Sequence, residues 1–164
     1  MRYGATGDAR TAGELKLYRT QAYGSDAQVT LLDARSFRDQ ELKPADPGNP
    51  ADVARFVARS FVPGRTLLGR VQLEDLKADL QKAERQGITW KFVMVPEPIQ
   101  NLGLLVAEDR YEGYAAERTE LLKFIHDHHI DNVVFVSADI HGTLVNNLTY
   151  QDGPGQPQVA TGAI

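Results

Sequence analysis

One stretch carries the strongest fold signal in this chain: Asn132-Val133-Val134-Phe135-Val136-Ser137-Ala138-Asp139-Ile140-His141. Its apolar, mostly β-branched start predicts a strand over 132–138 that is buried on both faces, as in α/β layers. Because side chains alternate along an extended backbone, Asp139 and His141 should leave the same face at the strand's C-terminal edge. Ligands bind at that edge in α/β sheets, and a carboxylate beside an imidazole can hold a divalent metal ion. The alternative is a turn-forming Asp139 followed by a histidine that bonds to backbone, and so short a motif leaves both open.

The composition is that of a globular domain. With 164 residues the chain is long enough for one domain with a real core, so we expect a single domain over 1–164. The net charge of −4 provides no basic surface, which makes nucleic acid a poor candidate partner. The absence of cysteine excludes disulfides, iron–sulfur clusters and a thiol nucleophile. No apolar stretch is long enough to span a membrane, and residues 1–8 lack the apolar segment of a signal peptide.

Strand and helix patterns alternate along the chain. Continuous apolar runs predict buried strands, and apolar residues at three- and four-residue spacing predict helices. The predicted elements, in chain order, are strand 27–33, loop 43–50, helix 52–60, helix 71–86, strand 90–95, helix 115–129, strand 132–138 and two further strands at 143–150 and 157–164. Such alternation predicts an α/β layered domain, with the helix leucines and Trp90 in its core.

Five short blocks follow one another at regular spacing. They are Leu31-Leu32-Asp33-x-Arg35-Ser36-x-Arg38-Asp39, Leu67-Leu68-Gly69-x-x-Gln72-x-x-x-Leu76, Trp90-Lys91, Asp109-Arg110-Tyr111-Glu112-Gly113-Tyr114-x-x-Glu117-Arg118, and Asn132-Val133-Val134 leading into Ala138-Asp139-Ile140-His141. Together they resemble the alkaline phosphatase D-like metallophosphoesterases of the calcineurin-like phosphoesterase superfamily, over about residues 18–164. No single block is specific, but five in this order are.

The resemblance implies part of a calcineurin-like layered β-sandwich, in which two facing sheets are flanked by helices and metal ions lie at the strand ends. It also implies hydrolysis of phosphate mono- or diesters, by enzymes that are often exported to the periplasm or the medium. The matching blocks belong to the C-terminal half of that catalytic domain. The family's earlier metal-binding blocks have no counterpart in residues 1–18, and the family's usual Gly-Asp-x-His has Ala138 in place of glycine here.

In this resemblance, Asp139 and His141 are the expected metal ligands, for calcium, iron, manganese or zinc. Two such ions could clamp the oxygens of a phosphoester and turn a bound water into hydroxide. Tight sites usually take about three or four protein ligands, more than these two residues supply. We therefore expect the isolated chain to be inactive.

Arg35 and Asp109 are the expected catalytic residues. The planar guanidinium of Arg35 could hold a phosphate oxygen, and its structural alternative is a salt bridge with Asp33 or Asp39. Asp109 could face the site from an irregular segment, and its alternative is to cap the helix that follows.

Other polar residues are weaker candidates. Glu97, Gln100 and Asn101 follow a predicted strand and could line a pocket, or belong to a rigid turn set by the neighbouring prolines. The histidines at 126, 128 and 129 lie at a predicted helix end, where capping is favoured over metal binding.

Two hypotheses therefore stay open. In the first, the chain supplies the C-terminal half of the site of a metal-dependent phosphoesterase. In the second, it is a catalytically silent α/β module without a complete metal cage. In both cases part of a sandwich should leave a sheet edge or apolar face exposed, so we expect self-association.

Overall fold

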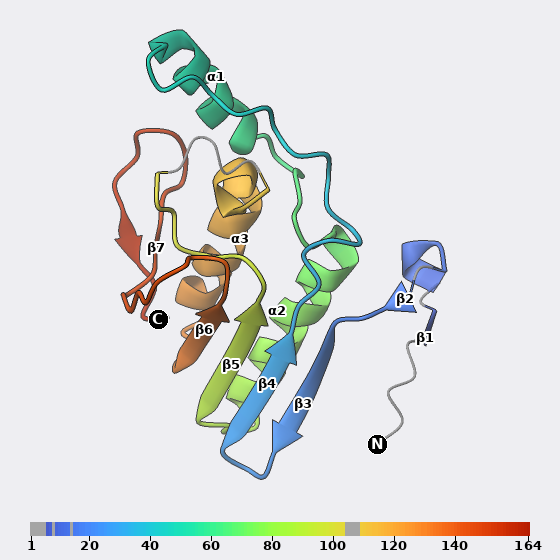
Figure 1. Cartoon of the computed structure of the whole chain (residues 1–164). Coiled ribbons are helices and arrows are strands. Elements are labelled where there is room, and N and C mark those ends of the chain that lie inside the picture. The colour runs from blue at the N-terminus through green and yellow to red at the C-terminus, as the bar shows by residue number, and fades with distance from the viewer. Residues whose placement is uncertain (1–5, 8, 14, 104–108) are drawn as a thin grey trace.

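A four-stranded sheet in the order β3-β4-β5-β6 forms the centre of the chain (Figure 1). The structure, a computed structural model, describes residues 6–7, 9–13, 15–103 and 109–164, so most of the N-terminal stretch 1–8 lies outside the described residues. β3 (Arg19–Tyr23) pairs antiparallel with β4 (Ala27–Leu31). β4, β5 (Trp90–Val95) and β6 (Val133–Ser137) run parallel to one another. The three strands predicted from apolar runs thus lie side by side, which confirms the α/β fold class.

Helices connect the parallel strands, because a parallel pair cannot be joined by a tight turn. α2 and α3 lie against the same face of the sheet (Figure 1). The remaining elements are α1 (Pro50–Ser60), α2 (Arg70–Arg85) and α3 (Ala115–Asp127), the short 3-10 helices η1 (Ala9–Thr11) and η2 (Tyr111–Tyr114), and the strand pairs β1 (Thr6–Gly7) with β2 (Leu15–Lys16) and β7 (Thr149–Tyr150) with β8 (Val159–Ala160). Each predicted helix is present to within two residues at either end. The strand predicted over 143–150 is wrong for 143–148, because only Thr149 and Tyr150 find a partner strand.

The main core lies between the sheet and the helices that cover it. It is built from apolar side chains on the covered face of the sheet and on the facing stripes of α2 and α3. They include Val93, Val95, Val133, Leu73, Leu76, Leu80, Leu121, Leu122 and Ile125. The helix leucines are therefore in the core, as their spacing predicts.

Only one face of the sheet is covered by helices among the residues that the structure describes (Figure 1). Lys91, Val93 and Val95 of β5 are buried, whereas Trp90 remains 44% exposed. On β6 the burial fades along the strand, and Val136 is 40% exposed. The predictions that 132–138 is buried on both faces and that Trp90 is a core residue are therefore wrong. Trp90 and Val136 both lie on the sheet face that no described helix covers.

The side chain of Gln72 ties α2 to the chain that leaves β4. Its amide oxygen accepts the backbone N–H of Asp33 at 2.8 Å, and its amide nitrogen donates to the Asp33 carbonyl, also at 2.8 Å. The same nitrogen donates to the Leu68 carbonyl at 2.6 Å. Because Gln72 is fully buried, these hydrogen bonds act without competition from water. The exit of β4 is thereby held at one position on the helix.

A second buried clamp joins α3 to the segment before α2. The carboxylate of Glu117 accepts the backbone N–H groups of Leu67 and Leu68, each at 3.1 Å, and the hydroxyl of Thr66. Burial raises the pKa of Glu117 to about 7, although these three hydrogen bonds oppose the rise. The native state therefore holds a proton that the unfolded chain has already lost at intermediate pH.

From the raised pKa of Glu117 we predict that the stability of the folded chain depends on pH. Because its folded pKa is raised, the free energy of unfolding should fall by about 3 kcal/mol as the pH rises from about 4.5 to 7. Glu117→Gln, which cannot ionise, should have a flatter profile over the same window. Urea unfolding at closely spaced pH values measures both slopes. Equal slopes for the wild type and the variant would contradict this role.

Candidate functional site

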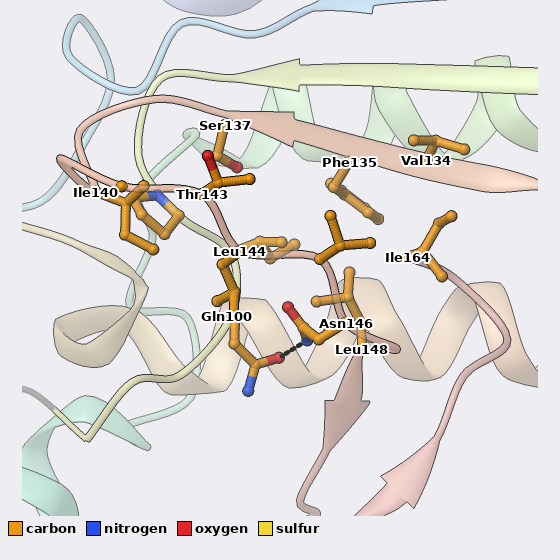
Figure 2. Close-up of a pocket in the computed structure, with 14 residues that line it drawn as sticks. Gln100, Val134, Phe135, Ser137, Ile140, Thr143, Leu144, Asn146, Leu148 and Ile164 are labelled. Atoms are coloured by element: carbon orange, nitrogen blue, oxygen red, sulfur yellow. Dashed lines mark hydrogen bonds between the residues drawn. The ribbon is translucent and has the colours of Figure 1, made fainter.

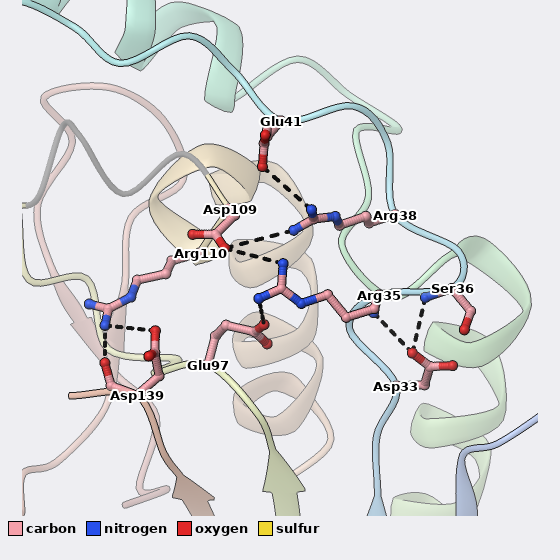
Figure 3. A network of polar contacts seen from close by, with 9 residues as sticks. All are labelled: Asp33, Arg35, Ser36, Arg38, Glu41, Glu97, Asp109, Arg110 and Asp139. Atoms are coloured by element: carbon pink, nitrogen blue, oxygen red, sulfur yellow. Dashed lines mark hydrogen bonds and ion pairs between the residues drawn. The ribbon is translucent and has the colours of Figure 1, made fainter. Parts of the chain in front are cut away.

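Charged side chains gather at the carboxyl edge of the three parallel strands. Asp33 and Arg35 follow β4, Glu97 follows β5, and Asp139 follows β6. Asp109, just before η2, completes the group (Figure 3). This edge is where α/β sheets bind their ligands. The predicted candidates Arg35, Asp109 and Asp139 therefore belong to one polar network.

Asp33 shapes the turn that carries Arg35. Its Oδ1 atom accepts the backbone N–H groups of Arg35 at 2.9 Å and of Ser36 at 3.0 Å. Burial pushes the pKa of Asp33 upward, but hydrogen bonds from Ser36 and from both backbone groups outweigh it and leave the pKa below its usual value. Its Oδ2 atom is buried and has no hydrogen-bond partner among the described residues. Asp33 thus stays ionised and organises the loop.

Arg35 forms ion pairs with two carboxylates. Its Nη2 atom lies 3.2 Å from Oε1 of Glu97, and its Nη1 atom lies 3.2 Å from Oδ2 of Asp109. The predicted alternative partners, Asp33 and Asp39, are both occupied by backbone N–H groups instead. Neither η2 nor α3 has a side-chain cap at its N-terminus, so the helix-capping alternative for Asp109 is wrong. Asp109 instead faces Arg35.

Glu97 is the least accessible member of the network, with 2% of its surface exposed. Burial raises its pKa, while the charge of Arg35 acts in the opposite direction and that of Asp109 adds to the rise. Its Oε2 atom is buried and has no hydrogen-bond partner in the described part of the chain. The sequence indicated Glu97 as a site candidate because it lies just after a buried strand. Of the two polar residues predicted beside it, Gln100 lines a separate cavity (Figure 2) and Asn101 accepts a hydrogen bond from the backbone of Gly103.

Asp139 binds an arginine that the sequence did not single out. Nη2 of Arg110 lies 3.1 Å from Oδ2 of Asp139 and also donates to the Asp139 carbonyl (Figure 3). β6 ends at Ser137, and both Asp139 and His141 have positive φ angles, 61° and 54°. Such left-handed backbone is uncommon for residues other than glycine and does not continue a strand. The prediction that extended alternation continues through residues 139–141 is therefore wrong.

The described residues do not fit a metal ion on their own. Over the described ranges, no group of three or more His, Cys, Asp or Glu side chains lies close enough to share one. The carboxylate of Asp139 is paired with Arg110, and His141 is exposed. His128 lies at the C-terminal end of α3, the helix-end position predicted for the histidines. Its Nδ1 atom is 3.0 Å from the Phe124 carbonyl.

Comparison with known proteins places this chain in a family. Residues 5–163 match the model of the family described as PhoD-like phosphatase. The chain belongs to the PhoD-like phosphatase family. This confirms the resemblance that the five blocks predict.

Two relatives show the extent of the match. Alkaline phosphatase D of Bacillus subtilis (strain 168) is 28% identical over 144 residues, which cover 82% of this chain and 23% of the relative. The solved structure of PhoD superposes with a TM-score of 0.68 at 24% identity, over 91% of this chain and 27% of that one, and so shares the fold. The chain spans about a quarter of the length of these relatives.

From the Arg35 ion pairs we predict that two substitutions shift the pKa of Glu97 in opposite directions. Arg35→Ala should raise the pKa of Glu97 further, because it removes the main favourable charge. Asp109→Asn should lower that pKa, because it removes a repelling carboxylate. A pH titration of the Glu97 carboxyl carbon by NMR distinguishes the two. Shifts of the same sign in both variants would show that the pairs do not control Glu97.

Proposed function

We propose that these 164 residues form the C-terminal portion of a catalytic domain that hydrolyses phosphate mono- or diesters. Membership of the PhoD-like phosphatase family supports the reaction class. The observation that carries the proposal is the placement of Arg35, whose guanidinium is held by two carboxylates at the ligand-binding edge of the sheet. An arginine oriented in this way is suited to a phosphoryl oxygen.

The surroundings of Arg35 explain how it would bind substrate. Its side chain is 57% exposed, so the guanidinium is accessible although two of its nitrogens have partners. Glu97, behind it, is almost fully buried and acts as a fixed anchor. Asp109 holds the other terminal nitrogen, and Arg38 lies 4.0 Å from the same Asp109 oxygen. In this proposal Arg35 contacts the phosphate, and Asp109 orients Arg35.

The proposed reaction needs metal ions, and the described residues supply only part of the ligands. The PhoD-like phosphatase family is generally metal-dependent. We propose that Asp139 and His141 are two ligands of a site for calcium, iron, manganese or zinc that needs further donors. Such an ion would supply Lewis acidity and a bound hydroxide. Arg110 should release Asp139 when the ion binds, because a guanidinium 3.1 Å from its Oδ2 atom would repel a second cation on the same carboxylate.

Substitution of the proposed ligands tests the assignment in the natural protein whose chain includes these residues. Asp139→Ala and His141→Ala should each lower phosphodiester hydrolysis by roughly a hundredfold or more, since loss of one ligand disturbs the metal and its hydroxide. His126→Ala, at an exposed helix end, is the matched control and should leave the rate unchanged. Unchanged hydrolysis in both ligand variants would make 139–141 a structural turn.

The 164 residues alone should hydrolyse p-nitrophenyl phosphate esters little or not at all, with or without calcium, iron, manganese or zinc. The reason is the donor count, since two ligands bind such an ion weakly. Robust metal-dependent turnover by this chain would contradict that expectation. It would also show that further ligands lie within these 164 residues.

The alternative is a folded module without catalysis of its own. The observation that favours it is the Arg110–Asp139 pair, which neutralises the one carboxylate at the end of β6 without any metal. The Asp139→Ala and His141→Ala variants of the natural protein distinguish the two proposals. If this module is silent, neither substitution should lower the rate of hydrolysis.

For partners, we propose a phosphoester substrate and contact between copies of the chain. No helix in the described ranges is long and apolar enough to cross a membrane. The uncovered sheet face places Trp90, Phe92 and Met94 of β5 beside residues of β4 and β6 on the same side. Apolar side chains in adjacent rows of a sheet form a continuous patch, which favours association.

Light scattering over a range of protein concentrations should therefore detect oligomers. Trp90→Asp should shift the chain toward monomer, since it places a charge in the apolar patch. Val62→Asp alters a similarly exposed apolar side chain on another surface and should not. A strict monomer at all concentrations would contradict the proposed contact.

A further inference from the structure

The segment of residues 40–65 runs out from the carboxyl edge of the sheet and back, and it carries α1 (Figure 1). It has a small hydrophobic core that is separate from the main core and consists of Leu42, Ala45 and Phe56. The residues on either side of the segment hold its two ends together. The N–H of Asp39 donates to the Thr66 carbonyl at 2.9 Å, and the N–H of Thr66 donates to Oδ2 of Asp39 at 3.0 Å.

Arg65, the last residue of this segment, connects the two sides of the polar network. Its Nη2 atom donates to the Gln40 carbonyl at 2.7 Å, and its Nε atom donates to the Gly113 carbonyl at 2.6 Å. Gln40 follows the loop that carries Arg35, whereas Gly113 belongs to η2, which begins just after Asp109 and its neighbour. The guanidinium of Arg65 therefore bridges the same two segments that the ion pair between Arg35 and Asp109 bridges.

The connection from Arg65 continues into the charged residues before η2. The N–H of Gly113 donates to the Arg110 carbonyl at 2.9 Å, so this glycine is bonded to Arg65 on one side and to Arg110 on the other. Tyr114 adds a second brace. The guanidinium carbon of Arg65 lies 4.5 Å from the centre of its ring, and its hydroxyl donates to the Asp39 carbonyl at 2.8 Å. The start of η2 is thereby held against the loop that follows β4.

We propose that Arg65 is a positioning residue, which sets the distance between Arg35 and Asp109 and thereby the orientation of the Arg35 guanidinium. These contacts of Arg65 are with backbone carbonyls and an aromatic ring, so it acts on the backbone of the two segments and not on the charges that they carry. A guanidinium is suited to this role, because its donors lie in one plane at fixed separations. An effect on hydrolysis rests on the proposed function, in which Arg35 contacts the phosphate.

The pKa of Glu97 reports the position of Asp109, because the charge of Arg35 lowers this pKa and the charge of Asp109 raises it. Glu97 is buried and holds Arg35, so Asp109 is the partner that should move when Arg65 is replaced. Arg65→Met removes the donors and keeps a long side chain. It should lower the pKa of Glu97 in a pH titration by NMR. If Arg65 acted by its charge alone, its loss would raise that pKa.

A double-mutant cycle tests whether Arg65 acts through Asp109. In Arg65→Met combined with Asp109→Asn, the pKa of Glu97 should fall no further than in Asp109→Asn alone, because no carboxylate remains to be displaced. Arg55→Met is the matched control, since it removes an arginine of the same segment whose ion pair is with Asp52, and it should leave the pKa of Glu97 unchanged. A raised or unchanged pKa in Arg65→Met, or a further fall in the double variant, would overturn the proposal.

Arg65→Lys is a second variant, which keeps the charge and decides the matter if Arg65→Met does not fold. A single ammonium nitrogen cannot reproduce the fixed pair of donors that reach both carbonyls. This variant should therefore also lower the pKa of Glu97. An unchanged or raised pKa would again overturn the proposal.

Kinetics of the natural protein that contains these residues separate this inference from the proposed function. Arg65→Met should raise the KM for a phosphoester substrate by roughly threefold or more, the scale of coupling between neighbouring residues, and should change kcat less. A lower pKa of Glu97 with an unchanged KM would support Arg65 as a positioning residue and contradict phosphate binding by Arg35. An increase in KM without any shift in the pKa of Glu97 would overturn the positioning role.

Discussion

The buried amide of Gln72 fixes the point at which the chain leaves β4, and the geometry of the polar edge depends on that point. Both backbone groups of Asp33 are bound by this one side chain. Asp33 then turns the backbone through its own carboxylate, so that Arg35 extends across the edge toward the residue that follows β5. A helix, two strand ends and an irregular segment are linked in this way by a few polar contacts. Since such networks are most effective when buried, the innermost contact sets the position of the outer ones.

The acidic groups of this edge differ in their environment. Asp33 has hydrogen bonds that keep its pKa low, whereas burial without enough partners raises that of Glu97. Asp139 is exposed and relies on Arg110. Arg110 therefore balances the charge of Asp139, the one acid of this edge that the proposal assigns to a metal ion. The proposed metal site would be completed by further donors that displace Arg110.

The parallel strands and the helices could be predicted because they rest on local periodicity, as the spacing of Leu73, Leu76 and Leu80 shows. Arg35, Glu97 and Asp139 of the polar edge were also predicted as candidates, because charged residues just after buried strands converge in an α/β sheet. Arg110 was not singled out. The pairing of these residues was not predicted. Arg35 binds residues 62 and 74 positions later in the chain, a contact that depends on strand order rather than on neighbours in sequence. The positive φ at Asp139 was missed because the alternation rule assumes that the strand continues.

The most direct test of the proposed site is anomalous X-ray diffraction from crystals of the natural protein that contains these residues, grown with its metal. We predict a metal peak within about 2.0 to 2.6 Å of a carboxylate oxygen of Asp139 and an imidazole nitrogen of His141. Arg110 should then have left Asp139, and Arg35 should keep both of its carboxylate partners. A metal bound elsewhere, with the Arg110–Asp139 pair intact, would contradict the account.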